Sequence, residues 1–192
     1  MNINIEISNI NKHFFSCENG DIHDESVNKY NTRLINYCFY SKNECIISNI
    51  IKKMRYYSSR FLVLEDYDFV DIGQLNEYFV DKCNLTDDVR YLIFKYKNRR
   101  LVAFNDFLFN IVSPKLFILN VIESFSHLLT SLIQLNDNNM CFFNLSPHNI
   151  GFDIDCGEKP VIRNFQTSLI ISKLDASYIT SIITRTRDYT HK

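Results

Sequence analysis

The most informative part of this sequence is Phe142-Phe143-Asn144-Leu145-Ser146-Pro147-His148-Asn149-Ile150. A long apolar segment precedes it, and Val161-Ile162-Arg163-Asn164-Phe165-Gln166 follows it after a short interval. Serine, proline and asparagine all form turns readily, so the first segment alone would be compatible with an ordinary turn. The second segment at this distance, with a long apolar helix predicted ahead of both, indicates a specific pair of motifs.

Together the two segments resemble the paired active-site motifs of the protein kinase family, H-R-D-L-K-P-x-N-I and then a hydrophobic residue with D-F-G. The matching positions are Leu145, Pro147, Asn149, Ile150 and Phe165. The resemblance covers roughly residues 90–170 and implies an α+β, protein-kinase-like fold of two lobes. Residues 1–96 would form a small N-terminal lobe of strands and one helix, and 97–192 a partial helical C-terminal lobe.

The charged groups that the family uses for catalysis are neutral here. Asn144 occupies the position of the catalytic base, and an amide can orient a hydroxyl but cannot take its proton. Asn164 occupies the position of the aspartate that holds Mg²⁺, and its oxygen brings no negative charge. Asn149 matches the second metal ligand and is retained. The resemblance therefore implies metal positions at Asn149 and Asn164, with weak or absent binding of ATP and Mg²⁺.

Other family features are missing. Phe142 and Phe143 replace the His-Arg pair, Ser146 replaces the catalytic-loop lysine, and Gln166 replaces the glycine of D-F-G. Gly20 is the only glycine in the first seventy residues, so no Gly-rich phosphate loop is present in the sequence.

The strand lysine that grips the phosphates is also not assignable. Lys29 and Lys42 flank the expected region, with Glu44 as a candidate helix partner, and surface charge is the ordinary role of all three. No cofactor-binding residue is therefore assigned.

Only 26 residues follow Gln166, where the family places its activation segment and further helices. The kinase-like fold is thus expected to be truncated after the metal-binding turn. Either the chain is a fragment of a longer product, or the substrate-binding half is missing.

Composition limits the function classes. The net charge of −1 gives no field for nucleic acid or a membrane surface, and no apolar run approaches the ~20 residues of a membrane-spanning helix. Six cysteines show neither C-x-x-C pairs nor zinc spacing, and no signal peptide is recognisable. These features predict reduced thiols in a cytosol-like compartment.

Residues with AT-rich codons, notably Asn and Ile, are abundant, which indicates an AT-rich genome such as that of a parasite, an endosymbiont or a large DNA virus. The motif is similar to those of the divergent Ser/Thr kinases of large DNA viruses. If the chain is viral, the expected location is the host cytoplasm or the virion.

Patterning predicts the elements that surround the motifs. Strands are expected at Met1–Ile10, Arg33–Tyr40, Phe61–Leu64 and Arg90–Tyr96, helices at Asn43–Tyr57 (capped by Ser41), Leu101–Val112 and Lys115–Leu135, and turns or loops at 16–31, Glu65–Asp71 and Lys97–Arg100. The last helix is expected to bury Phe125, Leu129 and Leu132 against the catalytic-loop region, with Phe142 or Phe143 in the same core. His127 is expected at the helix surface or in a polar part of the core.

Three functions remain open. The favoured one is a catalytically impaired pseudokinase that serves as a scaffold or regulatory module for a protein partner. The second is a weak Ser/Thr kinase that uses Asn149 and Asn164 for the metal and Asn144 for orientation. The third is a structural protein, for example a virion component, that has kept only the fold.

Overall fold

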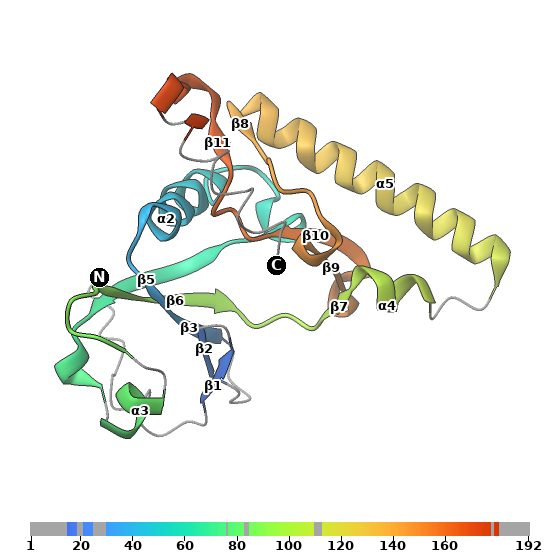
Figure 1. Ribbon diagram of the computed structural model, residues 1–192. Helices are drawn as coiled ribbons and strands as arrows, with labels where there is room; N and C mark the ends of the chain where they lie inside the picture. The colour runs from blue at the N-terminus through green and yellow to red at the C-terminus, as the bar shows by residue number, and fades with distance from the viewer. Residues whose placement is uncertain are drawn as a thin grey trace. The chain divides into compact units, whose positions relative to one another are not determined.

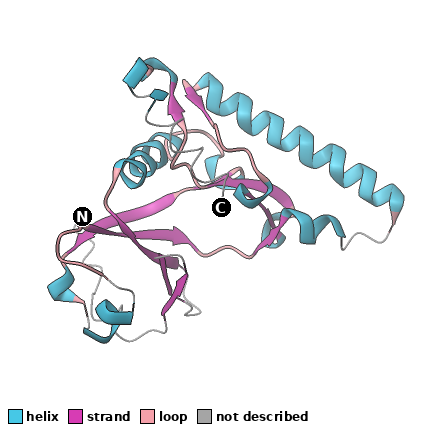
Figure 2. Ribbon diagram, in the orientation of Figure 1, coloured by secondary structure: helices cyan, strands magenta, loops and turns pink. Residues whose placement is uncertain are grey.

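The chain is an α+β protein, seen here in a computed structural model (Figures 1 and 2). The structure describes residues 15–18, 21–24, 30–75, 77–82, 85–109, 113–177 and 179–180. They fall into two compact units, the first within Met1–Cys45 and Leu64–Asn98, the second within Ile46–Val63 and Arg99–Lys192. The change of unit after Asn98 lies two residues beyond the predicted boundary, and 46–63 belongs with the second unit.

The first unit is built on a five-stranded antiparallel sheet. Its strands, in spatial order, are β1 (Phe15–Glu18), β2 (Asp21–Asp24), β3 (Tyr30–Asn36), β6 (Tyr91–Lys97) and β5 (Leu64–Val70). A 3₁₀ turn (Ile72–Gln74) and α3 (Glu77–Lys82) follow β5. The helix α2 (Phe39–Ile51) begins in this unit and continues into the second.

The strand β6, which lies between β3 and β5, confirms the strand predicted at Arg90–Tyr96, including its two faces. Tyr91 and Ile93 belong to one buried cluster, and Leu92 and Phe94 belong to another, with Tyr96 packed against it. Both faces of the sheet are therefore covered by apolar side chains. The Tyr96 hydroxyl donates a hydrogen bond of 2.9 Å to Glu44. Burial first, and then the charge of Glu44, raise the pKa of Tyr96 well above its ordinary value.

Two predicted loops of this unit are strands instead. The acidic segment Glu65–Asp71, expected to be a turn, forms most of the edge strand β5. Its carboxylates are accommodated because Asp66 accepts a hydrogen bond from the backbone of Tyr67, and Asp68 from that of Phe69. The segment 16–31 likewise contains β1, β2 and the start of β3. Polar composition predicted loops here because strand pairing with distant residues is not visible in a local pattern.

The predicted boundary between Arg33–Tyr40 and the next helix was also misplaced. The strand ends at Asn36, and α2 begins at Phe39 and ends at Ile51. Ser41 lies in the first turn of α2. Its hydroxyl accepts a hydrogen bond from the Cys38 backbone N–H and donates one to the Cys38 carbonyl. The strand predicted at Met1–Ile10 lies outside the described residues.

The second unit contains a four-stranded sheet in the order β4 (Phe61–Leu62), β10 (Lys159–Arg163), β9 (Ile150–Asp153) and β7 (Leu101–Ala103). A second, two-stranded sheet pairs β8 (Met140–Cys141) with β11 (Leu169–Ile170). The described part of this unit includes the helices α4 (Phe104–Phe109) and α5 (Pro114–Asp137), besides the end of α2.

The helix predicted at Leu101–Val112 starts later than expected, because its first residues form β7. This strand pairs with β9, and Ala103 lies opposite Gly151. A Cβ at Gly151 would lie 3.0 Å from the Leu101 Cβ, so a larger residue there would have to displace the Leu101 side chain slightly. The turn predicted at Lys97–Arg100 is wrong, because Lys97 is the last residue of β6 and 98–100 form irregular backbone that leads into β7.

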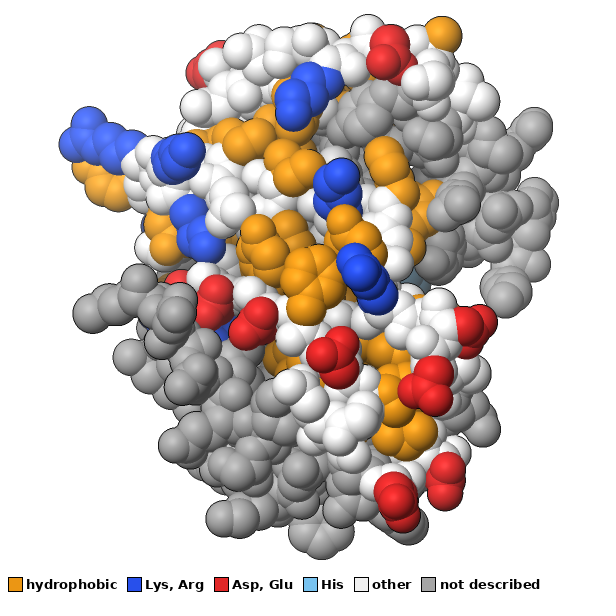
Figure 3. Space-filling view, turned by 90° about the vertical axis from the view of Figure 1, so that its left-hand side faces the viewer, with side chains coloured by type: hydrophobic (Ala, Val, Ile, Leu, Met, Phe, Trp, Pro, Cys, Tyr) orange, Lys and Arg blue, Asp and Glu red, His pale blue; other side chains and the backbone are white. Residues whose placement is uncertain are grey.

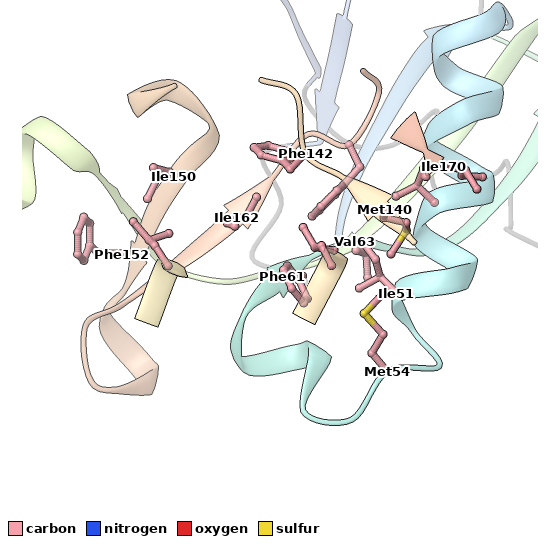
Figure 4. Packing of buried hydrophobic residues seen from close by; sticks show 14 residues of the cluster. Ile51, Met54, Phe61, Val63, Met140, Phe142, Ile150, Phe152, Ile162 and Ile170 are labelled. Atoms are coloured by element: carbon pink, nitrogen blue, oxygen red, sulfur yellow. The ribbon is translucent and has the colours of Figure 1, made fainter. Parts of the chain in front are cut away.

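One apolar core holds the second unit together (Figure 4). Ile47 and Ile51 of α2, and Met54 just after it, are buried in this core, and Ile46 and Ile50 pack against it. Phe142 is buried in the same core and Phe143 is exposed, so the expectation that at least one of the pair is buried is confirmed. The core therefore joins the end of α2 to the segment that carries the first motif.

The helix α5 confirms the predicted helix at Lys115–Leu135, but the predicted buried face is wrong. Its buried residues are Ser124, Leu128, Ser131 and Leu135. Phe125 is 70% exposed, Leu129 is 58% exposed, and Leu132 is only partly buried. The helix packs on β8 and β10 through a stripe in which two serines allow close approach. Large apolar residues occur all round this helix, so its periodicity could not identify the packed face.

The described part of the chain contains one helix, α5, that is long and apolar enough to cross a membrane by length and composition. The expectation that no apolar run approaches that length does not hold for it. Elsewhere on the surface, hydrophobic side chains lie between lysine and arginine side chains, as on the face in Figure 3. Exposed apolar residues interspersed with charges are ordinary for a folded protein.

Candidate functional site

The first motif forms a short loop and a single 3₁₀ turn between β8 and β9. Pro147 opens the turn Pro147–Asn149, where its fixed φ suits a first helical position. The backbone N–H of Ser146 donates to the Asn144 carbonyl at 3.0 Å, and that of Asn149 donates to the Ser146 carbonyl at 2.9 Å. These bonds present Asn149 at the start of β9, with its side chain turned inward.

The side chain of Asn149 connects the two other asparagines that the sequence singled out, Asn144 and Asn164. It is buried, and its Nδ2 donates to the backbone carbonyl of Asn144 at 3.0 Å and to the Ser146 hydroxyl at 3.2 Å. Its Oδ1 accepts a hydrogen bond of 3.1 Å from Asn164 Nδ2. Asn144, Asn149 and Asn164, hereafter the asparagine cluster, therefore lie together within the second unit, although twenty residues separate the first from the last.

The hairpin β9–β10 returns the second motif to the first. It pairs Ile150 with Ile162, and Asn164 follows directly after β10. Asn164 has a φ of 63°, in the left-handed region that asparagine tolerates better than most residues. This backbone conformation accompanies the contact of its amide with Asn149.

Arg163 ties the two motifs together from the other side. Its Nε and Nη2 both donate to the His148 carbonyl, at 3.0 and 2.9 Å. Burial lowers the pKa of this guanidinium from its ordinary value, and arginine remains charged at any physiological pH. The motifs did not predict this contact of Arg163, because the family motif has a hydrophobic residue at the corresponding position.

Phe165 anchors the second motif in the core. Its side chain is fully buried and meets the ring of Phe142 at a centroid distance of 5.3 Å and that of Phe61 at 6.0 Å, both edge to face. Such aromatic contacts add to the burial of apolar area and fix ring orientation. The position of the asparagine cluster is therefore set by packing as well as by hydrogen bonds.

The donor set of the cluster does not fit Mg²⁺. All three side chains are neutral amides, and the Asn149 oxygen already accepts a hydrogen bond from Asn164. Mg²⁺ in proteins is held by carboxylates and phosphates in strict octahedral geometry, and an amide supplies no charge to offset its dehydration. Over the residues that the structure describes, no group of three or more His, Cys, Asp or Glu side chains is placed to hold a metal ion.

The remaining predicted positions do not join the cluster. Glu44 is a buried residue of the first unit and accepts the hydrogen bond from Tyr96, whereas Lys42 is exposed. Gly20 and Lys29 lie outside the described residues. A phosphate-binding lysine is therefore not identified among these candidates.

A cavity of about 590 Å³ lies elsewhere in the second unit, between α5 and the turn that enters β10. Its lining includes His127, Asn120, Glu123, Glu158 and Lys159, and none of the three cluster asparagines. His127 is half-buried, and desolvation, followed by the charge of Arg60, lowers its pKa. The sequence did not point to this cavity, which arises only when α5 packs on the β9–β10 hairpin, and it is not the site of the motif chemistry.

No protein-family model matches this chain, and no curated protein matches it. The motif residues and their geometry are thus the basis for a function.

Proposed function

We propose that this chain is a protein-kinase-like domain with impaired catalysis, a pseudokinase that acts as a scaffold or regulatory binding module for a protein partner. The observation that carries the proposal is the hydrogen bonding of the asparagine cluster, in which Asn149 links Asn144 and Asn164. These contacts support a kinase-like arrangement of the two motifs, in which none of the three side chains carries a charge.

Three features support the kinase-like frame. The loop of the first motif leads into a hairpin that brings the second motif alongside it. The two motifs are joined by the Asn149–Asn164 contact and by the Arg163 clamp on the His148 carbonyl. The aromatic residue of the second motif, Phe165, is buried against the first at Phe142.

The chemistry of the cluster supports impaired catalysis. Asn144 has no basic group near neutral pH, so it could position a hydroxyl but not accept its proton. The amides of Asn149 and Asn164 satisfy each other, and a cation would have to break their hydrogen bond without gaining a carboxylate. A surface that binds a protein partner needs neither a catalytic base nor a charged metal ligand.

A second candidate, a weak Ser/Thr kinase, draws on the same geometry. The side chains of Asn149 and Asn164 lie within hydrogen-bond distance, so their oxygens could turn toward one ligand. Phosphoryl transfer depends mainly on positioning and electrostatic stabilisation, with little covalent chemistry supplied by the protein. Nucleotide binding distinguishes this candidate from a module that does not use ATP.

We expect 1 mM ATP with Mg²⁺ to stabilise the chain by less than about 1 kcal/mol, because ligand stabilisation follows RT ln(1 + [L]/Kd) and a millimolar site gives little. For a chain of this size, this corresponds to a shift in melting temperature below about 4 °C in a thermal-shift measurement. A larger shift that requires Mg²⁺ would contradict the pseudokinase proposal and support the weak kinase.

Matched variants sharpen this test. Asn164→Asp would restore a negative charge at the metal position, and Asn144→Asp would place the same charge at the base position. We expect a Mg²⁺-dependent increase in the nucleotide shift for Asn164→Asp that exceeds the increase for Asn144→Asp. Equal responses of the two variants would show that Asn164 does not occupy a metal position.

A further inference from the structure

The outer face of α5 carries an uninterrupted row of large apolar side chains. Ile118, Ile122, Phe125 and Leu129 are each more than half exposed, and Ile133 continues the row. We call these five residues the α5 seam. Packing among the described residues of the unit does not explain this row, since the helix buries a different stripe against β8 and β10. Contiguous exposed apolar surface of this kind marks an interaction site.

The spacing of the seam indicates what it fits. From Ile118 to Leu129 the residues are four, three and four positions apart, which is the alternation of a heptad seam. Such a row lies straight along the helix and receives another helix at a shallow crossing angle, with side chains interlocked. The fitting partner is therefore a helix with the same repeat, and α5 itself supplies that repeat.

The charges of α5 select an antiparallel arrangement of two copies. Lys115 stands at the start of the helix, Asp137 at its end, and Glu123 is the remaining charged residue between them. A parallel pair would place Lys115 beside Lys115 and Asp137 beside Asp137. An antiparallel pair brings Lys115 of one copy toward Asp137 of the other and opposes the two helix dipoles, both of which are favourable.

We infer that a second copy of this chain packs on the α5 seam, as an antiparallel helix pair. In the register that places Phe125 of one copy level with Leu129 of the other, Ile122 lies within one residue of Ile133. Both central layers then contain large apolar side chains from each copy. This inference depends on α5 alone and not on the proposed pseudokinase function.

A membrane is the other surface that an apolar helix could meet. By length and composition α5 could cross a bilayer. The centre of the helix, however, carries Glu123, His127 and Ser131, which would be costly to place in hydrocarbon. The buried stripe of α5 is also part of the apolar core of the second unit, through Leu128 and Leu135. The observations thus favour a helix partner in water.

Sedimentation of the full chain over a range of concentrations up to about 100 µM tests this inference, because an interface of micromolar affinity assembles within that range. We expect the mass to rise from 22.7 kDa toward twice that value. Phe125→Glu combined with Leu129→Glu should weaken association at least tenfold without changing the melting temperature of the dilute protein. Leu116→Glu changes an exposed apolar residue of the same helix that lies three or four positions from none of the seam residues, and it should leave association unchanged.

Charge swaps test the pairing. A chain that carries Phe125→Lys and Leu129→Lys should associate with the chain that carries Phe125→Glu and Leu129→Glu, while neither associates with itself. Lys115→Glu alone should weaken the dimer about fivefold, because it replaces the attractive Lys115–Asp137 pair at each end by two like charges. Addition of Asp137→Lys should restore the dimer, because each end then carries opposite charges again.

Three outcomes would overturn the inference. One is a chain that stays monomeric throughout the concentration range. Another is a dimer that is insensitive to the paired Glu substitutions in the seam. The third is a monomer that floats with phosphatidylcholine and phosphatidylglycerol vesicles through the same seam residues, which would assign the surface to a membrane.

Discussion

Replacing Phe165 with alanine is expected to lower the free energy of unfolding by about 3–5 kcal/mol, the usual cost of removing a fully buried aromatic side chain. Phe165 has no exposed surface, and its ring packs edge to face on Phe61 and Phe142. The substitution would leave a cavity between β4 and the first motif, because neighbouring side chains relax only in part. Urea unfolding, followed by far-UV circular dichroism, measures the loss.

Phe125→Ala is the matched control, since it removes the same atoms from an exposed site. Phe125 is 70% exposed, so in dilute protein its loss should change stability by less than about 0.5 kcal/mol. Working near 1 µM keeps any self-association from contributing to the apparent stability. A large loss for Phe125→Ala with a small loss for Phe165→Ala would mean that the core of the second unit is misassigned.

Asp153→Ala is the second substitution with a large expected effect, about 3–5 kcal/mol, because it leaves a buried charge without its partner. The Arg99 guanidinium donates its Nε to Asp153 Oδ2 at 2.6 Å, and the two side chains are only 9% and 2% exposed. The other carboxylate oxygen accepts from the backbone of Asp155, which fixes the turn after β9. The same unfolding measurement applies.

A neighbouring ion pair provides the comparison. Arg100 and Asp155 form a pair that is exposed on both sides, and Asp155→Ala should change stability little because water screens it. Replacing Arg99 and Asp153 together by apolar residues should cost less than Asp153→Ala alone, since no unpaired charge remains. Equal losses for Asp153→Ala and Asp155→Ala would contradict the assignment of a buried pair.

The sequence predicted some elements well for identifiable physical reasons. The strand β6 alternates apolar residues for two covered faces, and α5 has helical spacing over its whole length. The edge strand β5 was missed because its acidic residues resemble a turn, and its pairing with β6 depends on residues far along the chain. The buried stripe of α5 was misplaced because the seam is equally apolar.

The candidate site was predictable only where a motif named it. Asn144, Asn149 and Asn164 were singled out by resemblance, and in the structure the Asn149 side chain forms hydrogen bonds with the Asn144 backbone carbonyl and with the Asn164 amide. The Arg163 clamp and the cavity beside His127 were not predicted, since both are produced by packing of distant segments rather than by a local pattern. The amide pairing of Asn149 with Asn164 likewise required the geometry of the β9–β10 hairpin.

Phosphate transfer from labelled ATP is the most direct test of the pseudokinase proposal. The purified chain and its Asn149→Ala variant would be incubated with Mg²⁺ and a generic protein substrate, and label in both proteins measured. We expect the unmodified chain to transfer no more phosphate than Asn149→Ala, because no cluster residue supplies a base or a charged metal ligand. Robust transfer by the unmodified chain, lost in Asn149→Ala, would contradict the pseudokinase assignment and establish an active kinase.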